Sequence, residues 1–506
     1  MSLSTSLFLS AFLALTCYIV LRQTQKGKTP PGPKSTNLFG GGKMYSWKWS
    51  EELYRKYGSI VGFRAGGDHY VLLSSPSDAE ELLAKQAVHF SGRKEVVYAG
   101  KYRSNNKRML LLPHSDELHK QRLMFKFLVR STALQSYHVR EELHLARLLE
   151  NLIDSPLKYH DHLYYYTAGI IMAVTYGIDV KANQDILDEI LSSNASFNKD
   201  AVPGAHLVDI MPWLDYLPDI LSPWRKDAIQ KHQMEIKLFG KLANDVKIRL
   251  GQGVDTDCLM AHVWSSQSKD KLDDESIAYL GGSAFEAGTS VTAFLIHTFL
   301  LACVNYPGMV SRAQAELDNI TPDELPQYHQ MKQMPYLHAV VKETLRWIPV
   351  TPLAFPHQSE RSMDYKGYEI PARSLIIPSI WNMHRNPENF RDPSVFDPNR
   401  WFDPDDNGHV KSSSNLLAGH WAFGFGRREC PARYLAVDLA WGAIASLLWA
   451  FDIKGVTDQS TGKAMNIDPD MIPWMDGVNI EPAPFPISIT PRSSVHITKI
   501  KSKCSA

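Results

Sequence analysis

One long segment that is almost without charge, residues 274–304, constrains the fold of this chain more than any other feature. Between Glu275 and Arg312 the only formally charged residue is Glu286. A continuous helix of about 30 residues would be about 45 Å long, and a helix that is apolar on all sides lies either inside a large protein or inside a membrane. Glycine, serine, threonine and histidine residues occur along the segment and disfavour contact with lipid. We therefore expect a central buried helix with one large domain built around it.

The composition agrees with a large domain and excludes several classes of function. Of 506 residues, 44% are hydrophobic and 21% are charged, so the chain can form a sizeable core. Lysine plus arginine and aspartate plus glutamate both number 54, and this balance predicts no nucleic acid as a partner. The five cysteines are far apart and form no CxxC pair, which argues against a disulfide scaffold and against a cysteine-based zinc site. A reducing compartment fits this cysteine usage best.

A second apolar segment lies at the N-terminus. Residues 3–21 contain no charge, and these 19 residues would form a helix about 29 Å long, close to the thickness of a bilayer core. The flank that follows, up to Lys34, carries four basic residues and no acidic one, so the positive-inside rule places it in the cytosol. A cleaved signal peptide is the alternative, but its positive charge should precede the apolar run. We expect a transmembrane anchor over residues 1–24, a proline-rich linker over 25–34 and a single domain over 35–506.

The remaining sequence predicts a mainly α fold with small β-sheets. Alternating runs at 59–64 and 70–73 indicate two strands, with Gly66–Asp68 as the turn between them. Most of residues 76–350 shows helical spacing. The stretch 211–224 is rich in proline and tryptophan and predicts an apolar loop on the surface. Such a loop can touch a bilayer or frame the entrance for an apolar ligand, although a plain packed loop fits equally well.

The strongest chemical signal is a glycine-rich segment that ends in a cysteine. The sequence FGFGRREC runs from Phe423 to Cys430 and leads into a predicted apolar helix at 434–451. A cysteine in this position suits a thiolate bound to a metal, because the glycines let backbone N–H groups approach the sulfur and the helix N-terminus favours negative charge. Taken alone, a single cysteine of this kind is more often an inert buried thiol.

Three further motifs change that balance. An ExxR pair, Glu343 and Arg346, lies on a predicted helix, the sequence FDPNRW starts at Phe396, and FEAG starts at Phe285 within the uncharged segment. Together with the cysteine loop, their order and spacing resemble the cytochrome P450 family, whose members are haem-thiolate enzymes. The resemblance covers essentially the whole chain after the predicted anchor.

The resemblance implies the cytochrome P450 fold, in one large catalytic domain, with haem b as the cofactor. Cys430 would be the axial ligand of the haem iron and would donate electron density to it. Phe423 would lie against the sulfur, and Gly426 would form the tight turn of the loop. Six more residues take roles from the family: the haem propionate donors Arg122, His357 and Arg428, and the buried structural triad Glu343, Arg346 and Arg400. The basic face around Arg122 could also dock an acidic electron donor.

The uncharged helix departs from the family where protons are delivered. Read without gaps, the family's acid–threonine pair falls on Ser290 and Val291, so both the carboxylate and the threonine hydroxyl are missing. An oxygen-activating site needs proton donors within hydrogen-bond reach. The remaining candidates are Thr289, Ser290 and Thr292, together with the substrate or water held by these hydroxyls; a hydroxyl-rich buried turn is the plain alternative. Gly288 lacks bulk, as expected of a helix against which a flat ligand presses.

Substrate contacts can be placed only by region of the family's pocket. The candidates are aromatic and apolar residues, each of which could equally be plain core: Trp213, Phe285, Leu353, Phe355 and Trp474.

These features predict a monooxygenase in the endoplasmic reticulum membrane, with one transmembrane segment and a cytosolic catalytic domain. It would use O2 and electrons from NADPH, delivered by NADPH–cytochrome P450 reductase, to oxidise an apolar, aromatic small molecule. Residues 205–224 and the cysteine loop look similar to enzymes of fungal secondary-metabolite biosynthesis, which catalyse hydroxylation, ring closure and oxidative coupling; the altered helix favours coupling or ring closure. A reductase-independent isomerase or lyase and a non-catalytic membrane haem protein are the alternatives. The chain contains no HExxH, GxxxxGK[ST] or GxSxG motif that would indicate another chemistry.

Overall fold

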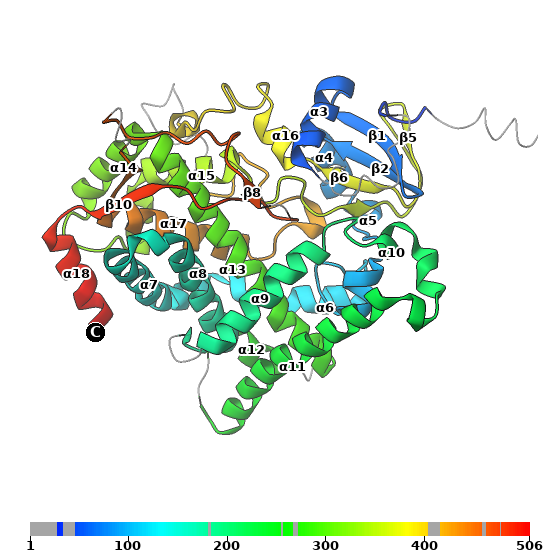
Figure 1. The fold of residues 1–506 in the computed structure, drawn as a ribbon, viewed down its shortest axis with the longest axis horizontal. Coiled ribbons are helices and arrows are strands. Elements are labelled where there is room, and N and C mark those ends of the chain that lie inside the picture. The colour runs from blue at the N-terminus through cyan, green and yellow to red at the C-terminus, as the bar shows by residue number, and fades with distance from the viewer. Residues whose placement is uncertain are drawn as a thin grey trace, which may run out of the picture.

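Helix α13 (Asp274–Asn305) runs through the middle of the structure, and other helices and a sheet at one end surround it (Figure 1). The computed structural model describes residues 28–33, 46–180, 184–254, 257–266, 272–402, 415–457, 462–475 and 477–505. The predicted anchor over residues 1–24 and part of the predicted linker lie outside these described residues. Within them the fold is mainly helical with small sheets, as the sequence predicts.

The sequence of α13 explains both its start and its burial. The Asp273 side chain accepts a hydrogen bond from the backbone N–H of Ser276 at 2.7 Å, which caps the first turn. Within the described part of the chain, α13 is the one helix with the length and hydropathy of a membrane span, but 78% of its most apolar stretch is buried inside the protein. The prediction of a central core helix is confirmed.

Glycines let the neighbouring helices approach α13 closely. A Cβ on Gly288 would lie 2.6 Å from Ile171 in α8 (Tyr159–Tyr176), and one on Gly282 would lie 2.5 Å from the ring of Phe239 in α11 (Pro223–Gly251). Gly288 therefore serves helix packing. The expectation that a flat ligand presses against this turn stays a prediction.

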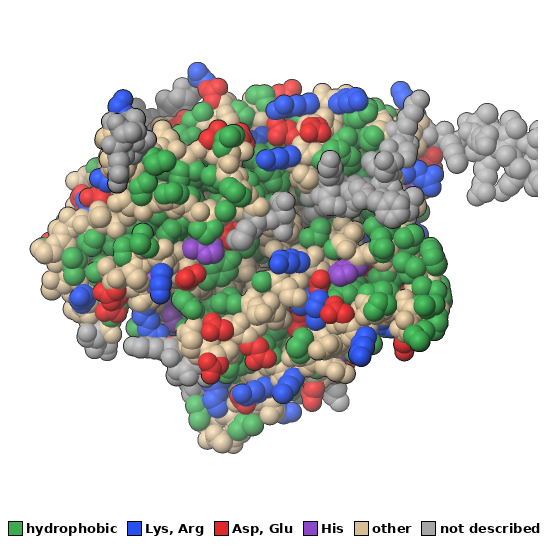
Figure 2. Space-filling view, viewed as in Figure 1, with side chains coloured by type: hydrophobic (Ala, Val, Ile, Leu, Met, Phe, Trp, Pro, Cys, Tyr) green, Lys and Arg blue, Asp and Glu red, His purple; other side chains and the backbone are tan. Residues whose placement is uncertain are grey.

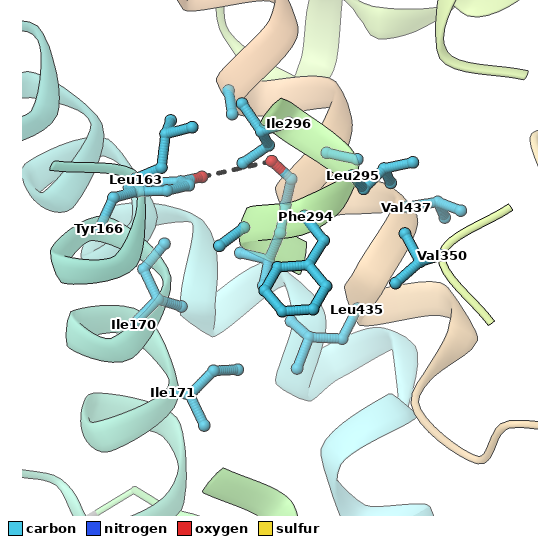
Figure 3. Packing of buried hydrophobic residues seen from close by; sticks show 14 of the residues in the cluster. Leu163, Tyr166, Ile170, Ile171, Phe294, Leu295, Ile296, Val350, Leu435 and Val437 are labelled. Carbon is cyan, nitrogen blue, oxygen red and sulfur yellow. Dashed lines mark hydrogen bonds between the residues drawn. The ribbon is translucent and has the colours of Figure 1, made fainter. Parts of the chain in front are cut away.

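On the C-terminal side of Gly288, apolar side chains of α13 pack against α8 and α17 (Arg433–Ala450). Figure 3 shows this buried cluster, in which the labelled side chains include Leu163, Ile170, Phe294, Ile296 and Leu435. Burial of each such side chain contributes about 1.5–3 kcal/mol to stability. The packing holds α13 in a fixed position beside the start of α17.

A four-stranded sheet lies at one end of the helical body (Figure 1). Its order is β1 (Ile60–Ala65), β2 (Asp68–Leu73), β6 (Leu375–Pro378) and β3 (His357–Gln358), with β2 parallel to β6 and the outer pairs antiparallel. Gly66 and Gly67 make the turn between β1 and β2 with φ of 57° and 87°, the left-handed region that glycine favours. Both predicted strands and their turn are confirmed.

Three two-stranded sheets complete the β structure. Their pairs are β7 (Phe451–Gly455) with β10 (Ile487–Pro491), β4 (Met363–Tyr365) with β5 (Tyr368–Ile370), and β8 (Trp474–Met475) with β9 (Glu481–Pro482).

The described part of the proline-rich segment, residues 28–33, lies against β1 and β5. The backbone N–H of Gly62 in β1 donates to the carbonyl of Pro31 at 2.9 Å, and the N–H of Glu369 in β5 donates to the carbonyl of Lys28 at 3.1 Å. These bonds attach residues 28–33 to the sheet end of the molecule.

The remaining helices surround α13 and the sheet. The longer ones are α3 (Trp47–Tyr57), α6 (Asp116–Phe125), α7 (Ser131–Asp154), α9 (Gln184–Asp200), α12 (Leu259–Ser266), α14 (Pro307–Ile320), α15 (Pro335–Trp347) and α18 (Ser494–Ser505). The short ones are α4 (Pro76–Ala79), α5 (Ala87–Phe90), α10 (Leu207–Ile210), α16 (Ile380–Arg385), the π-helices Glu80–Lys85 and Val97–Tyr102, and the 3-10 turns Lys126–Val129, Pro156–Lys158, Pro212–Tyr216, Asp219–Leu221, Tyr328–Gln333, Pro398–Trp401 and Gly426–Arg428.

Residues 207–221 carry an exposed apolar surface, as predicted for the stretch 211–224. Trp213, Tyr216 and Ile220 are 59%, 90% and 89% exposed. Together with Leu207 and Leu221 they form what we call the 207–221 patch. Apolar side chains gather over this part of the molecule, beside α10, on the right of Figure 2.

Candidate functional site

The cysteine loop is a tight turn that ends just before α17. The backbone N–H of Cys430 donates to the carbonyl of Phe423 at 2.9 Å, which closes the loop. Gly426 has φ of 60°, and a Cβ there would collide with the carbonyl oxygen of Leu83 in the π-helix Glu80–Lys85. Glycine is therefore required at this position, in line with the turn that the sequence predicts.

The Cys430 thiol lies among groups that favour its ionised form. Burial raises the pKa of the thiol, while the backbone N–H of Ala432 and the guanidinium groups of Arg122 and Arg433 act in the opposite direction. A thiol that coordinates a metal ion is deprotonated by it. The loop thus offers one sulfur ligand that a metal would hold as the thiolate.

An accessible face interrupts the burial of α13. Ala287 is exposed and Val291 is half-buried, although the helix is buried on both sides of this turn. Residues four apart lie on one face of a helix, so Ala287 and Val291 border the same space. Cys430 is also partly accessible, although it lies deep among protein atoms. We call the accessible space beside Ala287 and Val291 the hollow, and the predicted prosthetic group would lie against it.

Three predicted cationic residues bind backbone carbonyls in the interior. Arg428 donates to the carbonyls of Ser91 and Leu112, both at 2.8 Å, and Arg122 donates to the carbonyl of Glu429 at 3.0 Å. The Nδ1 of His357 lies 2.7 Å from the carbonyl of Phe90, and the ring is buried. These contacts leave further N–H donors on both guanidinium groups, whereas a neutral His357 that donates from Nδ1 keeps only an acceptor at Nε2.

The charge on these groups is not balanced locally. Burial and the neighbouring Arg122 lower the pKa of Arg428 to about 10, and burial lowers the pKa of Arg122. Burial, Arg93 and Arg428 hold the pKa of His357 far below its usual value. Neither Arg122 nor Arg428 forms an ion pair with a carboxylate among the described residues. Buried cations need anionic partners, and the two carboxylates of haem would supply them, so these residues fit the predicted cofactor.

Arg93 belongs to the same region and was missed by the sequence analysis. Its guanidinium donates to the carbonyls of Phe355 and Pro356, next to His357. In the sequence Arg93 is followed by Lys94 and resembles an exposed basic pair, so no pattern marked it.

The predicted triad comes together around one carboxylate. Arg346 donates to Glu343 at 2.9 and 2.7 Å, and the Nε of Arg400 donates to Glu343 at 2.9 Å. Glu343 also accepts from the indole N–H of Trp401 at 3.0 Å and from the backbone N–H of Asp397 at 2.9 Å. The cluster ties α15 to the segment that carries the FDPNRW motif.

Of the three predicted hydroxyls, only that of Ser290 lies beside the accessible face. Its Oγ accepts a hydrogen bond from the Nδ2 of Asn194 in α9 at 2.6 Å. Thr289 and Thr292 are buried, and at about 100° per residue they point away from the face of Ala287 and Val291. The structure therefore does not bring Thr289 and Thr292 to the hollow.

Comparison with known proteins decides the family. A family model described as cytochrome P450 matches residues 29–468. The chain belongs to the cytochrome P450 family. P450 enzymes hold a haem iron through a cysteine thiolate and take electrons from a redox partner, which agrees with the loop at Cys430.

Full-length relatives of this P450 occur in fungi. The cytochrome P450 monooxygenase fogE of Aspergillus ruber is 29% identical, over 97% of this chain and 92% of the relative. A cytochrome P450 monooxygenase of Armillaria gallica is 30% identical, over 97% of this chain and 96% of the relative. The cytochrome P450 monooxygenase virE of Hypocrea virens is 28% identical, over 94% and 87%.

The five predicted substrate contacts of this P450 do not form one pocket. Phe285 and Leu353 are fully buried in the core, and Trp213 is exposed in the 207–221 patch. Trp474 packs edge-on against Trp47, with 6.3 Å between ring centroids. The structure thus separates the five candidates, and at least Phe285 and Leu353 are plain core, the alternative that the sequence left open for each of them.

Phe355 does line a cleft in the surface of the P450. The cleft lies between the β1–β2 turn, residues 94–96 and residues 201–210. Its walls include Ala65, Val96, Pro203, Ile210 and Phe355. Its mainly apolar lining suits the entrance of an apolar molecule.

A buried ion-pair network, also missed by the sequence analysis, lies on the other side of the accessible turn. Arg108 pairs with Glu286 in α13 and with Glu235 in α11, and its guanidinium stacks on the ring of Phe197 at 3.7 Å. Arg103 binds the same Glu235 at 2.6 Å. These bonds fasten the segment that follows the π-helix Val97–Tyr102 to the helices around the hollow.

Burial raises the pKa of Glu286, and Arg108 opposes this effect. Glu286 immediately precedes Ala287 in α13, so one side of the central turn is polar. The ion pair of Arg108 and Glu286 thus lies next to the accessible turn of α13.

Proposed function

We propose that this P450 is a membrane-bound monooxygenase that oxidises an apolar, aromatic small molecule in fungal secondary-metabolite biosynthesis. It would use O2 and two electrons from NADPH, delivered by NADPH–cytochrome P450 reductase. The observation that carries this proposal is the Cys430 loop, closed onto Phe423 and facing a region of unbalanced buried positive charge. The fungal origin of the relatives supports the biological setting.

Each residue of the site has a defined task in this proposal. Cys430 would hold the iron, and Arg122, Arg428 and His357 would hold the two propionates. Haem in this setting supplies oxygen activation. The Glu343 cluster keeps α15 and the FDPNRW segment in place and does not touch the substrate.

Proton supply favours ring closure or oxidative coupling over hydroxylation. Val291 on the accessible face has no proton to give, and the Oγ of Ser290 already accepts from Asn194. A single hydroxyl beside the hollow makes a poor relay for the two protons that oxygen activation consumes. A substrate with its own acidic hydroxyl, such as a phenol, would supply protons itself.

The proposed location is the endoplasmic reticulum membrane, with residues 1–24 as a single anchor and the catalytic domain in the cytosol. The 207–221 patch supports it, because exposed Trp213, Tyr216 and Ile220 are suited to the interface between lipid and water.

The haem assignment is tested with Cys430→Ala. The purified wild-type protein, reduced and exposed to CO, should show the absorption shift of a thiolate-bound haem, and the variant should lose it. Persistence of the thiolate-type spectrum in the variant would refute Cys430 as the ligand.

The reaction class is tested by comparing metabolites of cells with and without the gene and by turnover of the purified enzyme with and without NADPH and reductase. Dependence on NADPH supports the monooxygenase. A reductase-independent isomerase or lyase remains a second candidate, favoured by Val291 at the threonine position, and predicts turnover without NADPH. A non-catalytic haem protein predicts haem binding with no product in either arm.

A further inference from the structure

Three side chains that are far apart in the sequence converge beside the C-terminal part of α13. His160 is near the start of α8, His297 is in α13, and Glu481 is in β9. The Nε2 of His160 and the Nδ1 of His297 both lie 3.0 Å from the Oε1 of Glu481. All three potential ligand atoms lie within 4.8 Å of one another, and Glu481 and His297 are fully buried.

Two of these side chains, Glu481 and His297, are held in place by a further polar group. The hydroxyl of Tyr164 donates to the Oε2 of Glu481 at 3.1 Å. The Nε2 of His297 lies 3.4 Å from the hydroxyl oxygen of Tyr159. Metal-binding histidines and carboxylates are oriented by such outer partners in most metal sites.

The donor atoms suit a divalent cation. Two imidazole nitrogens and one carboxylate oxygen converge on one point, and His160 and His297 are the ion-pairing partners of Glu481 among the described residues. Imidazole and carboxylate are side chains that bind metal ions.

We propose that His160, His297 and Glu481 form a zinc site, with Nε2, Nδ1 and Oε1 as the three protein ligands. Two imidazoles and one carboxylate are a usual donor set for Zn2+, which completes a tetrahedron with water. The side chain of His160 is 23% exposed and gives the ion and its water a path from solvent. Bound zinc joins α8 and β9 to α13 and thereby fixes the strand pair β8–β9 against the central helix.

The test uses the full-length, haem-loaded protein after dialysis against a chelator. Zinc affinity is measured by competition with a chromogenic chelator, and zinc content by elemental analysis. We expect one zinc per chain in addition to the haem iron, and a rise in the thermal unfolding temperature when Zn2+ is added. The CO-reduced spectrum should stay the same, which shows that the ion does not bind at Cys430.

Variants separate a zinc site from a plain hydrogen-bonded cluster. His160→Ala, at the solvent edge, should weaken zinc binding by about 100-fold or more, and Tyr164→Phe, which keeps all three ligands, by about tenfold. His114→Ala is the matched control, because His114 is a surface histidine 3.8 Å from Glu360, and it should bind zinc like wild type. X-ray absorption at the zinc edge should show nitrogen and oxygen neighbours at about 2.0–2.1 Å and no sulfur.

Three outcomes would overturn the proposal: no zinc bound by the wild-type protein, equal zinc affinity in wild type and His160→Ala, or a sulfur neighbour at the zinc edge. Tyr164→Phe keeps the test decisive if His160→Ala does not fold. The result is independent of the proposed oxidation reaction, since no readout depends on turnover.

Discussion

Among single residues, Ser290 has the most direct bearing on oxygen chemistry. Its Oγ accepts a hydrogen bond from Asn194 at 2.6 Å, and Asn194 also donates to the backbone carbonyl of Glu286. The Ser290 O–H is then oriented away from Asn194 and is available as a donor. Val291 beside it is aliphatic and has no proton to donate. Of the three predicted hydroxyls, only that of Ser290 lies at the accessible face.

We predict that Ser290→Ala raises the hydrogen peroxide released per NADPH consumed by several-fold, since protons arrive too slowly and reduced oxygen escapes. The ratio is measured with the reconstituted reductase system. Thr292→Val is the control, because that hydroxyl is buried on another side of α13. Equal coupling in wild type and Ser290→Ala would make the hydroxyl a bystander.

Glu141 in α7 is a second residue with a measurable effect. Burial raises the pKa of its carboxyl to about 8, with small further increases from Asp438 and Glu142, while the Tyr328 hydroxyl acts in the opposite direction. The native state therefore favours the protonated form. The associated stability is present below the unfolded-state pKa near 4 and is lost as pH rises towards 8.

Glu141→Gln removes this dependence, because the amide does not ionise. As pH rises from 5 to 8, the free energy of unfolding of wild type should fall by at least about 1 kcal/mol relative to that of the variant. Each unit of pKa shift corresponds to about 1.4 kcal/mol. Chemical denaturation across that pH range measures the difference. Glu142→Gln, at the partly exposed neighbour, should follow wild type; a parallel gain there would contradict the assignment.

At the scale of elements, one carboxylate joins α15 to the FDPNRW segment. Arg346 and Arg400 both bind Glu343, and Trp401 completes its hydrogen bonds. Arg346 also donates to the carbonyls of His384, Pro393 and Val395. Removing the negative charge would leave two cations without their counter-ion.

Glu343→Gln should destabilise the protein by about 3–5 kcal/mol, the usual cost of breaking a buried ion pair from one side, and should lower the haem content of the purified protein. Thermal unfolding and the ratio of haem to protein measure the two effects. Glu324→Gln is the matched control, because the Glu324–Lys499 pair lies on the surface, where solvent screens the attraction and its loss should leave stability nearly unchanged. Similar losses in both variants would show that burial of the Glu343 cluster does not determine its contribution to stability and haem content.

At the scale of the whole molecule, structural features encoded by a local sequence pattern could be predicted. Features that depend on contacts between residues far apart in the sequence could not. The absence of charge around Glu286 sufficed to predict α13, and the ExxR and cysteine motifs identified the Glu343 cluster and the Cys430 loop. The bond from Arg108 to Glu286 joins residues 178 positions apart, and no periodicity in the sequence encodes such a pair. The same limit explains why Phe285 was expected in a pocket and lies in the core.

The proposed topology makes a prediction for glycosylation. The chain has sequons at Asn194 and Asn319. Asn194 is 6% exposed and hydrogen-bonded to Ser290, whereas Asn319 at the end of α14 is exposed. A cytosolic domain should carry no glycan at Asn319, so treatment of microsomes with an endoglycosidase should not change the mobility of the protein. A shift that disappears in Asn319→Gln would place the domain in the lumen.

The hydrogen bonds that attach residues 28–33 to β1 and β5 limit the distance between the catalytic body and its proposed anchor. Between residue 24 and Lys28 the backbone can extend by at most about 14 Å, which is less than half the thickness of a bilayer core. With the proposed anchor in the bilayer, this short connection would keep the sheet end of the catalytic body near the lipid headgroups. Gly66 in the β1–β2 turn lies close to Ile210 in α10, which begins the 207–221 patch. The tether and the apolar patch would thus press the same side of the enzyme onto the lipid, with the Phe355 cleft opening beside it.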